Sequence, residues 1–359
     1  MELEDQIREI EEEIANTKYN KATQHHIGKL KAKLAQLKEK VETRKKSKGK
    51  GLGFGVRKTG HATVVFVGLP SVGKSTLLNR LTNAQSRVGA YEFTTLEVIP
   101  GMMSYEGVNI QLLDLPGLIT GAAGGKGRGR EVLSMVRNAD LCLIVLDVNR
   151  IASGEEIKNE LEDIGVRLDK EEPDITLKRR DRGGIKITKT RKVRRLDEQT
   201  IKSILGVHGI HNADVLIRED INEDQLNDAI LGNRVYVPSI VVVNKIDTKP
   251  GARLPRGYLP ISAEDGSNLE ELKDLMFKKL DFIRVYMKPQ GGKADYKEPM
   301  ILKKGATVKD LCEKMHKDFV EKFRYAIVSG DSVKHDEQRC GITHVLKDRD
   351  TVTIIKELQ

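Results

Sequence analysis

The sequence predicts an α/β protein built on a doubly wound, mostly parallel sheet. Short apolar runs at residues 64–67, 110–113, 141–146 and 240–243 alternate with segments of helical periodicity. Continuous apolar strands separated by helices are typical of a parallel sheet that is covered on both faces. The glycine-rich stretch GLPSVGKST, residues 68–76, lies between the first apolar run and a helical segment. In such folds, strand-to-helix loops of this kind bind phosphates.

Length and composition limit the possible classes. A chain of 359 residues suggests two or three domains, and a net charge of +9 points towards a polyanionic partner. The three cysteines are far apart in the sequence, so we expect a reducing compartment and no zinc site. No apolar run is long enough to span a membrane and no signal peptide is evident. We therefore expect a cytoplasmic protein with no membrane partner.

The N-terminal region, residues 1–46, predicts a helical hairpin. Apolar residues recur at spacings of three and four over residues 2–16 and again over 24–42. Asn20 and Thr23 between these segments are candidate N-caps of the second helix. A solvated hairpin or a dimerising coiled coil is at least as well supported as an RNA-contacting module.

The phosphate loop follows a basic, glycine-rich linker at residues 47–62. Gly68, Gly73, Lys74 and Ser75 fit the spacing G-x-x-x-x-G-K-[ST], and the two glycines allow backbone N–H groups to approach phosphate oxygens. Lys74 would reach the β- and γ-phosphates, and the Ser75 hydroxyl would bind Mg²⁺. A glycine turn with a chance lysine is the weaker interpretation. The residues expected to contact the nucleotide here are Gly68, Leu69, Pro70, Ser71, Val72, Gly73, Lys74, Ser75 and Thr76.

A second motif, D-x-x-G, follows the apolar run at 110–113. The Asp114 carboxylate can hold the magnesium ion through water, and the Gly117 N–H can bond a γ-phosphate. The segment YEFTT, residues 91–95, supplies a threonine hydroxyl for the same metal. Thr95 is favoured over Thr94 by a small margin.

A third motif, Asn244-Lys245-Ile246-Asp247, follows the apolar run at 240–243. Guanine offers two adjacent donors that one carboxylate can accept, whereas adenine offers a lone pair, so Asp247 would select guanine. Asn244 can connect the loops, and the stem of Lys245 can lie on the base. Ser262 and Ala263, after a short strand that ends at residue 261, can present a backbone N–H to the guanine oxygen.

The predicted α/β domain, residues 63–289, contains an insertion at about 166–236. The segment between Asp147 and Asn244 is much longer than the one crossover helix, 154–164, requires. Strand-like runs at 184–188 and 215–218 and helical runs at 197–205 and 223–231 indicate a small α+β unit. Its basic residues between positions 178 and 195 are either a solvated charge run or a phosphate-binding surface; the two interpretations are about equally supported.

The C-terminal region, residues 290–359, predicts a small β-rich domain. Strand-like runs at 300–302, 325–328 and 351–355 accompany one helix at 309–323. Its histidines have no metal-ligand spacing.

The stretches GLPSVGKST, YEFTT, DLPG, NKID and SVKH (residues 332–335) together resemble the developmentally regulated GTP-binding proteins among the Obg-related GTPases. The resemblance covers essentially the whole chain. It implies a P-loop GTPase domain interrupted by a ribosomal-protein-like insert, a C-terminal TGS domain of β-grasp type, and association with ribosomes and translation. Among the site residues it implies catalytic roles for Lys74, Thr95 and Gly117, and metal binding by Ser75, Thr95 and Asp114.

Two positions depart from wider GTPase patterns. Leu118 replaces the glutamine that orients water in Ras-like proteins, so intrinsic turnover should be slow. Ser71 replaces an asparagine that helps many Obg-related proteins to hold an activating K⁺ ion, which leaves K⁺ as a second candidate cofactor.

The sequence thus predicts a GTP-binding protein that hydrolyses GTP to GDP and phosphate, acting as a switch associated with the ribosome or structured RNA in translation. An ATPase on the same fold and a nucleotide-stabilised RNA-binding module with incidental hydrolysis are the alternatives. A regulatory protein is a further candidate partner.

Overall fold

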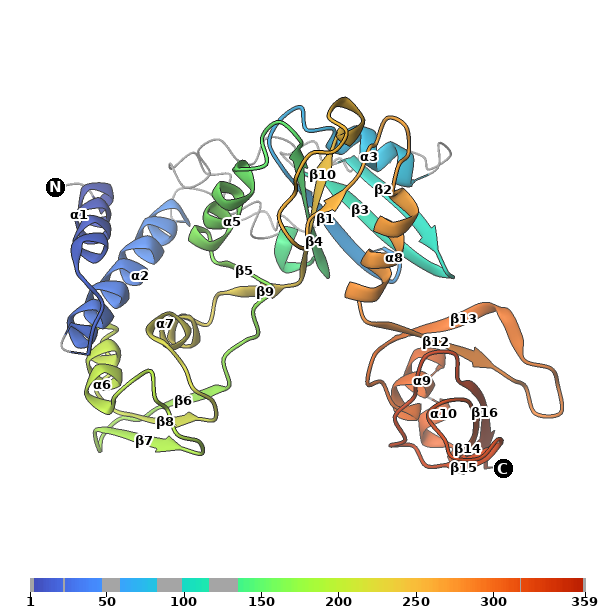
Figure 1. Cartoon of the computed structure of the whole chain (residues 1–359). Coiled ribbons are helices and arrows are strands. Elements are labelled where there is room, and N and C mark those ends of the chain that lie inside the picture. Colours follow the sequence, from blue (N-terminus) through green and yellow to red (C-terminus); the bar gives the residue numbers. More distant parts are fainter. Residues whose placement is uncertain are drawn as a thin grey trace. The chain divides into compact units, whose positions relative to one another are not determined.

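A computed structural model describes residues 3–21, 23–46, 59–82, 99–115, 135–316 and 318–357 (Figure 1). The chain divides into two compact units. One unit combines Met1–Phe54 with Glu162–Tyr236, and the other combines Gly55–Leu161 with Val237–Gln359.

The second unit contains the sheet that the sequence predicts. Within the described residues this sheet has six strands in the order β11-β10-β4-β1-β3-β2. Its parallel strands are β1 (Ala62–Val67), β3 (Val108–Asp114), β4 (Leu141–Asp147), β10 (Ser239–Asn244) and β11 (Leu259–Pro260). The edge strand β2 (Ile99–Tyr105) is antiparallel to β3, and the sequence analysis missed it. The predicted α/β class with a mostly parallel sheet is confirmed.

Helices cover both faces of this sheet, which is why its strands read as continuous apolar runs. On one face, alternate side chains such as Phe66 and Leu143 form a core with α3 (Lys74–Leu81) and α8 (Leu269–Lys279). Leu146 has the opposite parity and lies against Gly154 of α5 (Ser153–Asp163).

The first unit joins the N-terminal hairpin to the insert. Helix α1 (Leu3–Asn16) packs on α2 (Gln24–Lys46), and Asn20 and Thr23 exchange hydrogen bonds at the turn between them. Helix α2 also packs on α6 (Glu198–Val207) and α7 (Glu223–Leu231) of the insert. Ala32 of α2 is 0% exposed and belongs to the hydrophobic core of the insert. The hairpin and the insert, which the sequence predicts as separate modules, therefore share one core.

The sheet of the insert comprises β6 (Ile175–Arg179), β8 (Ala213–Ile217) and β7 (Ile185–Lys189), in the order β6-β8-β7 within the described residues. Apolar side chains on one face of this sheet pack into the core against α6. A second pairing, between β5 (Val166–Leu168) and β9 (Val235–Val237), lies where the insert begins and ends.

The C-terminal sheet has the order β13-β12-β16-β14-β15 among the described residues. Its strands are β12 (Phe282–Met287), β13 (Asp295–Lys303), β14 (Phe323–Ser329), β15 (Gln338–Cys340) and β16 (Thr351–Lys356). Since β12 pairs with β13 and β16, the sheet begins before residue 290, where the sequence analysis placed the boundary.

The single helix expected at 309–323 is wrong. Two helices occupy this segment, α9 (Val308–Met315) and α10 (Asp318–Glu321), because His316 adopts an extended backbone conformation that ends α9. A capping box between Thr307 and Asp310 fixes the start of α9. None of the helices in the described part of the chain is long and apolar enough to cross a membrane.

Candidate nucleotide-binding site

The predicted phosphate loop connects the end of β1 to the start of α3. Close packing around the loop requires glycine at both motif positions, Gly68 and Gly73. A Cβ at Gly68 would overlap the carbonyl oxygen of Val145, and one at Gly73, which has φ +88°, would overlap the side-chain amide of Asn244. The neighbouring strand ends can therefore approach the loop backbone only because these positions lack side chains.

Lys74 is the first residue of α3, and its side chain folds back over the loop. Its Nζ donates to the carbonyl oxygens of Gly68 at 2.9 Å and Leu69 at 3.0 Å. Burial lowers the pKa of Lys74, while the nearby Asp114 carboxylate acts in the opposite direction. An ammonium group has three donors, so one remains for a phosphate oxygen.

Ser75 and Asp114 lie side by side at the ends of different elements. The Ser75 Oγ donates to Asp114 Oδ2 at 2.8 Å. Asp114 is 3% exposed, and its buried Oδ1 has no hydrogen-bond partner among the described residues. A hydroxyl beside a buried carboxylate with an unsatisfied oxygen fits Mg²⁺, which prefers oxygen ligands and usually keeps several waters.

Two of the predicted contacts to the metal and the γ-phosphate lie outside the described residues. Thr95, the other predicted metal ligand, and Gly117, the predicted γ-phosphate donor, both fall in segments that the structure does not describe. The described residues contain no group of three or more His, Cys, Asp or Glu side chains that could hold a metal alone. Ser75 and Asp114 therefore do not form a complete metal site by themselves.

Asn244, at the end of β10, connects two loops of the site. Its Nδ2 donates to Val72 O in the phosphate loop, and its Oδ1 accepts from the Ala263 N–H, both at 2.9 Å. The side chain is buried, with 2% of its surface exposed. These two bonds connect the loops in the way expected of Asn244 from the sequence.

Lys245 follows in the left-handed conformation, with φ 63°. Its Nζ donates to Ser71 O at 2.7 Å and forms an ion pair with Asp147 at 2.9 Å. Burial alone would raise the pKa of Asp147, but bonds from Lys245 and from the Asn149 N–H outweigh it and hold this pKa below its ordinary value. Asp147 is a site residue that sequence reasoning missed, although its place at the end of β4 could have indicated it.

Asp247 lies in a short 3₁₀ helix, Ile246–Thr248, and is exposed. No described residue forms a hydrogen bond or ion pair with its carboxylate. Both oxygens are therefore available to accept from the edge of a base.

Ser262 and Ala263 differ from the sequence-based expectation. The Ala263 N–H donates to Asn244, and the Ser262 N–H donates to Ser267 O at 3.2 Å, so both amides already have partners within the protein. Arg80 holds this loop, since its Nε donates to Ala263 O at 3.1 Å and its terminal nitrogen donates to Glu264 O. Arg80 is not among the residues predicted from the sequence, because nothing in the local pattern relates α3 to this loop.

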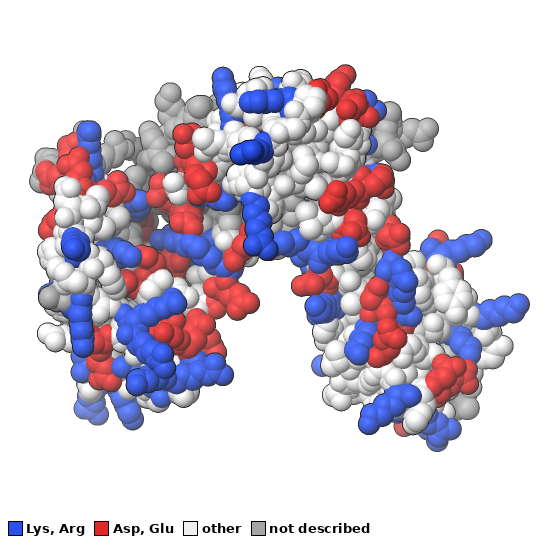
Figure 2. All heavy atoms as spheres, viewed as in Figure 1, with Lys and Arg blue, Asp and Glu red and all other residues white. Residues whose placement is uncertain are grey.

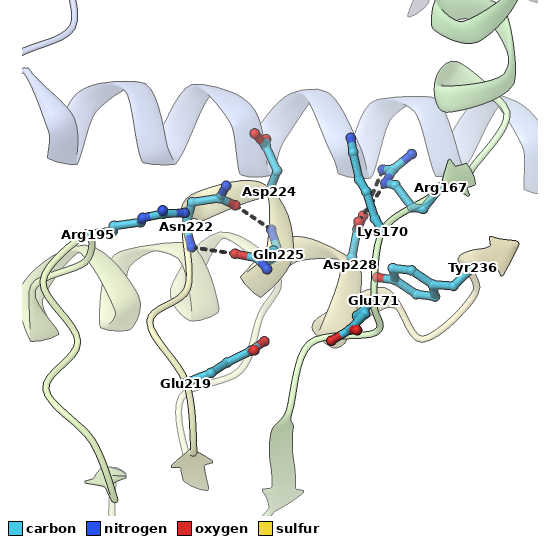
Figure 3. Close-up of a pocket in the computed structure, with 10 residues that line it drawn as sticks. All are labelled: Arg167, Lys170, Glu171, Arg195, Glu219, Asn222, Asp224, Gln225, Asp228 and Tyr236. Carbon is cyan, nitrogen blue, oxygen red and sulfur yellow. Dashed lines mark hydrogen bonds and ion pairs between the residues drawn. The ribbon is translucent and has the colours of Figure 1, made fainter. Parts of the chain in front are cut away.

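A separate pocket of about 420 Å³ lies in the unit formed by hairpin and insert (Figure 3). Its cations already have acidic partners: Arg167 forms two bonds with Asp228, at 2.7 and 2.9 Å, and Lys170 pairs with Glu162. Burial raises the pKa of Tyr236, also on its wall, to about 12. Paired cations and a protonated phenol give this pocket none of the groups predicted to bind a nucleotide.

Comparison with known proteins identifies the chain. Residues 63–179 match a family model described as a 50S ribosome-binding GTPase, and residues 182–282 match the C-terminal region of that domain. Residues 283–356 match the TGS domain. Developmentally-regulated GTP-binding protein 1 of Xenopus laevis is 48% identical over 360 residues, which are 98% of each chain. The chain belongs to the family of developmentally regulated GTP-binding proteins. The membership that its motifs imply is thus confirmed.

Other members of the family are similarly close. A GTP-binding protein of Methanocaldococcus jannaschii is 53% identical over 365 residues, covering 99% of this chain and 93% of that protein. The ribosome-interacting GTPase 1 of Saccharomyces cerevisiae is 43% identical over 364 residues, covering 98% and 99%.

Proposed function

We propose that this member of the developmentally regulated GTP-binding proteins binds GTP and hydrolyses it to GDP and phosphate. The observation that carries the proposal is the double hydrogen bond of Asn244 to Val72 and Ala263, which joins the phosphate loop to the predicted base-binding loops. Asp247, three residues further on, presents a carboxylate that pairs with none of the described residues. Family membership supports the same activity.

Individual residues have distinct parts in this proposal. Lys74 would donate its remaining N–H to phosphate oxygens, and Ser75 and Asp114 would hold Mg²⁺, directly and through water. A bound Mg²⁺ would neutralise charge on the β- and γ-phosphates. Thr95 and Gly117 stay proposed on sequence alone. Because Leu118 cannot orient water, we expect slow intrinsic turnover.

We propose that K⁺ supplies positive charge at the phosphates in addition to that of Mg²⁺ and Lys74. Ser71, at the position of the potassium-linked asparagine, has φ 64° and accepts from Lys245 through its carbonyl. Hydrolysis rates measured in matched potassium and sodium buffers test this point. A large stimulation by potassium would show that Ser71 permits a cation site, whereas equal rates would remove K⁺ from the proposal.

The biological setting is also a proposal. One relative is named a ribosome-interacting GTPase, and the chain carries a net charge of +9. These two facts support a cytoplasmic switch that binds the ribosome or structured RNA during translation. A regulatory protein bound by the helical hairpin is less favoured, because α2 already uses a face to pack on the insert.

The decisive experiment for hydrolysis compares the wild type with Lys74→Ala. GTP-dependent phosphate release should disappear in this variant, since the lysine is the proposed phosphate ligand. Lys334→Ala is the matched control, because Lys334 is an exposed lysine of the C-terminal domain. Undiminished release by Lys74→Ala would place catalysis elsewhere. Co-sedimentation with ribosomes, with GDP and with a non-hydrolysable GTP analogue, tests the proposed switch.

A further inference from the structure

One face of the insert's three-stranded sheet has no helix packed on it in the described unit. The core side is formed by Ile175 and Leu177 of β6 and Ile185 and Ile187 of β7. Side chains alternate between the two faces of a strand, so Lys178 and Lys186 project from the opposite face. Strand register places both of them beside Asp214 of the central strand β8.

The basic residues of this region differ in whether they are neutralised. Residues 178–195 include ten basic residues and one acidic residue, Asp181. Arg180 pairs with Asp214, Lys189 with Glu198 and Arg195 with Asp220. The other seven basic residues are exposed and have no hydrogen bond or ion pair from their side chains among the described residues. Arg179 lies on the same side of β6 as Leu177, and the backbone N–H of Arg194 donates to Asp220. We call the remaining five the basic face: Lys178, Arg182, Lys186, Arg191 and Lys192.

Asp214 does not cancel this charge. Its Oδ2 accepts from Arg180 Nε at 2.8 Å and from a second guanidinium nitrogen of the same residue. The carboxylate is thereby neutralised by Arg180, which leaves Lys178 and Lys186 uncompensated. In the pocket of the same unit, by contrast, Arg167 pairs with Asp228 (Figure 3), and Lys170 pairs with Glu162.

Four of the five residues of the basic face lie on β7 or in the segments next to it. Arg182 lies in the turn that leads into β7, Lys186 lies on β7, and Arg191 and Lys192 lie in the loop after it. A strand of five residues is about 17 Å long. Figure 2 shows Lys and Arg side chains gathered over the end of this unit where β6, β7 and β8 lie in Figure 1.

We propose that the basic face binds the phosphate backbone of folded RNA. The inference rests on the proposed association with ribosomal or structured RNA, and it assigns that association to one surface. The open face carries Thr176 and Thr188, whose hydroxyls can also donate to phosphates. It carries no aromatic side chain for stacking on bases, so binding reads backbone shape and charge rather than sequence.

A structural interpretation accounts for part of the same pattern. Lysines on edge strands prevent sheets from pairing edge to edge, and both β6 and β7 are edges of the described sheet. This explanation does not extend to Arg182, Arg191 and Lys192, which lie outside the strands. It also predicts a different consequence of removing the charge, namely self-association.

The test uses the full chain with the triple substitution Lys178→Gln, Lys186→Gln and Lys192→Gln. Binding of a fluorescently labelled stem-loop RNA is measured by anisotropy over a range of salt concentrations. The slope of the logarithm of the association constant against the logarithm of the salt concentration is negative. In the variant it should become shallower by roughly 2 to 3, since each phosphate contact contributes about one unit. The affinity of the variant at low salt should fall by at least about tenfold.

A matched control variant carries Lys29→Gln, Lys33→Gln and Lys40→Gln. These three lysines are exposed on α2 of the same unit, so the control removes the same charge from another surface. It should keep most of the wild-type RNA affinity, and both variants should keep wild-type GTP affinity.

The possible failures are distinguishable. If the wild type binds RNA and the two triple variants lose affinity equally, net charge and not the basic face is responsible, and this inference is overturned. A wild type that fails to bind the stem-loop at low salt overturns both this inference and the proposed RNA association, while GTP hydrolysis is judged separately. If the basic-face variant binds RNA as the wild type does, the inference is also overturned. Loss of binding to poly-glutamate in that variant would then assign the surface to an acidic protein. Self-association of that variant, measured by sedimentation, would assign the lysines to edge protection.

Discussion

Asn244 Nδ2 donates a hydrogen bond to the carbonyl oxygen of Val72 at 2.9 Å, across a sequence separation of 172 residues. Replacing the residue by alanine would leave this buried carbonyl and the Ala263 N–H without their partner. An unsatisfied buried group costs about 1–3 kcal/mol, so Asn244→Ala should weaken GTP binding by at least about tenfold and lower the melting temperature. Nucleotide titration and thermal unfolding measure the two effects.

Asn109→Ala is the matched control for this substitution. Asn109 is an exposed asparagine near the start of β3, whereas Asp114 lies at the other end of that strand. Its side chain bonds to Ser104 on the surface. Comparable losses of GTP affinity in the two variants would show that the link between the loops is not needed.

Gly73→Ala tests the close approach of Asn244 to the phosphate loop. A Cβ at this position would overlap the Asn244 amide, and the backbone has φ +88°. GTP binding should become undetectable at micromolar protein concentration. Gly251→Ala separates steric overlap from backbone strain, because Gly251 has φ +77° but a Cβ there meets nothing within 4 Å. That control should keep wild-type affinity, and a binding-competent Gly73→Ala would contradict the proposed packing.

Much of the site could be predicted from the sequence because its motifs are local. The phosphate loop, Asp114 and residues 244–247 each follow an apolar strand, and parallel strands bring their carboxyl ends to one edge of the sheet. The strand β2, with sequence IPGMMSY, was missed because proline and glycine interrupt its pattern. Contacts such as Arg80 with Ala263 join residues far apart in the chain, so local periodicity cannot indicate them.

Gly28→Leu tests the shared core of hairpin and insert. A Cβ at Gly28 of α2 would lie 2.9 Å from Thr200 Cγ2 of α6, so a larger side chain would force the helices apart. Such overpacking costs about 1–3 kcal/mol, and limited proteolysis should detect earlier unfolding of this unit. GTP affinity should not change, because the nucleotide site lies in the other unit. Lys29→Leu, at the adjacent exposed position, should leave the stability nearly unchanged; equal effects would argue against tight packing at Gly28.

The folded state should become less stable at low pH because of His208. Burial lowers the pKa of His208 from 6.5, although a hydrogen bond with Asn227 and the charge of Glu39 act in the opposite direction. As the pH falls through 6.5, the unfolded chain therefore takes up a proton before the folded one, and stability decreases. The melting temperature should fall more in the wild type than in His208→Gln between about pH 7.5 and 5.5. Parallel decreases in both proteins would show that His208 does not contribute.

The joining of hairpin and insert illustrates what the sequence could not specify. Its periodicity indicates that residues 24–42 form an amphipathic helix, but not which apolar surface the helix covers. Ala32 and Gly28 are small residues that let α2 approach α6, and small residues carry little hydrophobic signal. The division into residues 1–46, 47–62, 63–289 with 166–236 inserted, and 290–359 therefore stays a prediction about domains.

A titration of the wild type with GTP and ATP tests guanine recognition by Asp247 most directly. The carboxylate should accept both donors of guanine, so GTP should bind at least roughly 100-fold more tightly than ATP. Asp247→Asn should shift the preference towards xanthosine triphosphate, whose 2-oxo group accepts where guanine donates. Equal affinities of the wild type for ATP and GTP would contradict guanine selection.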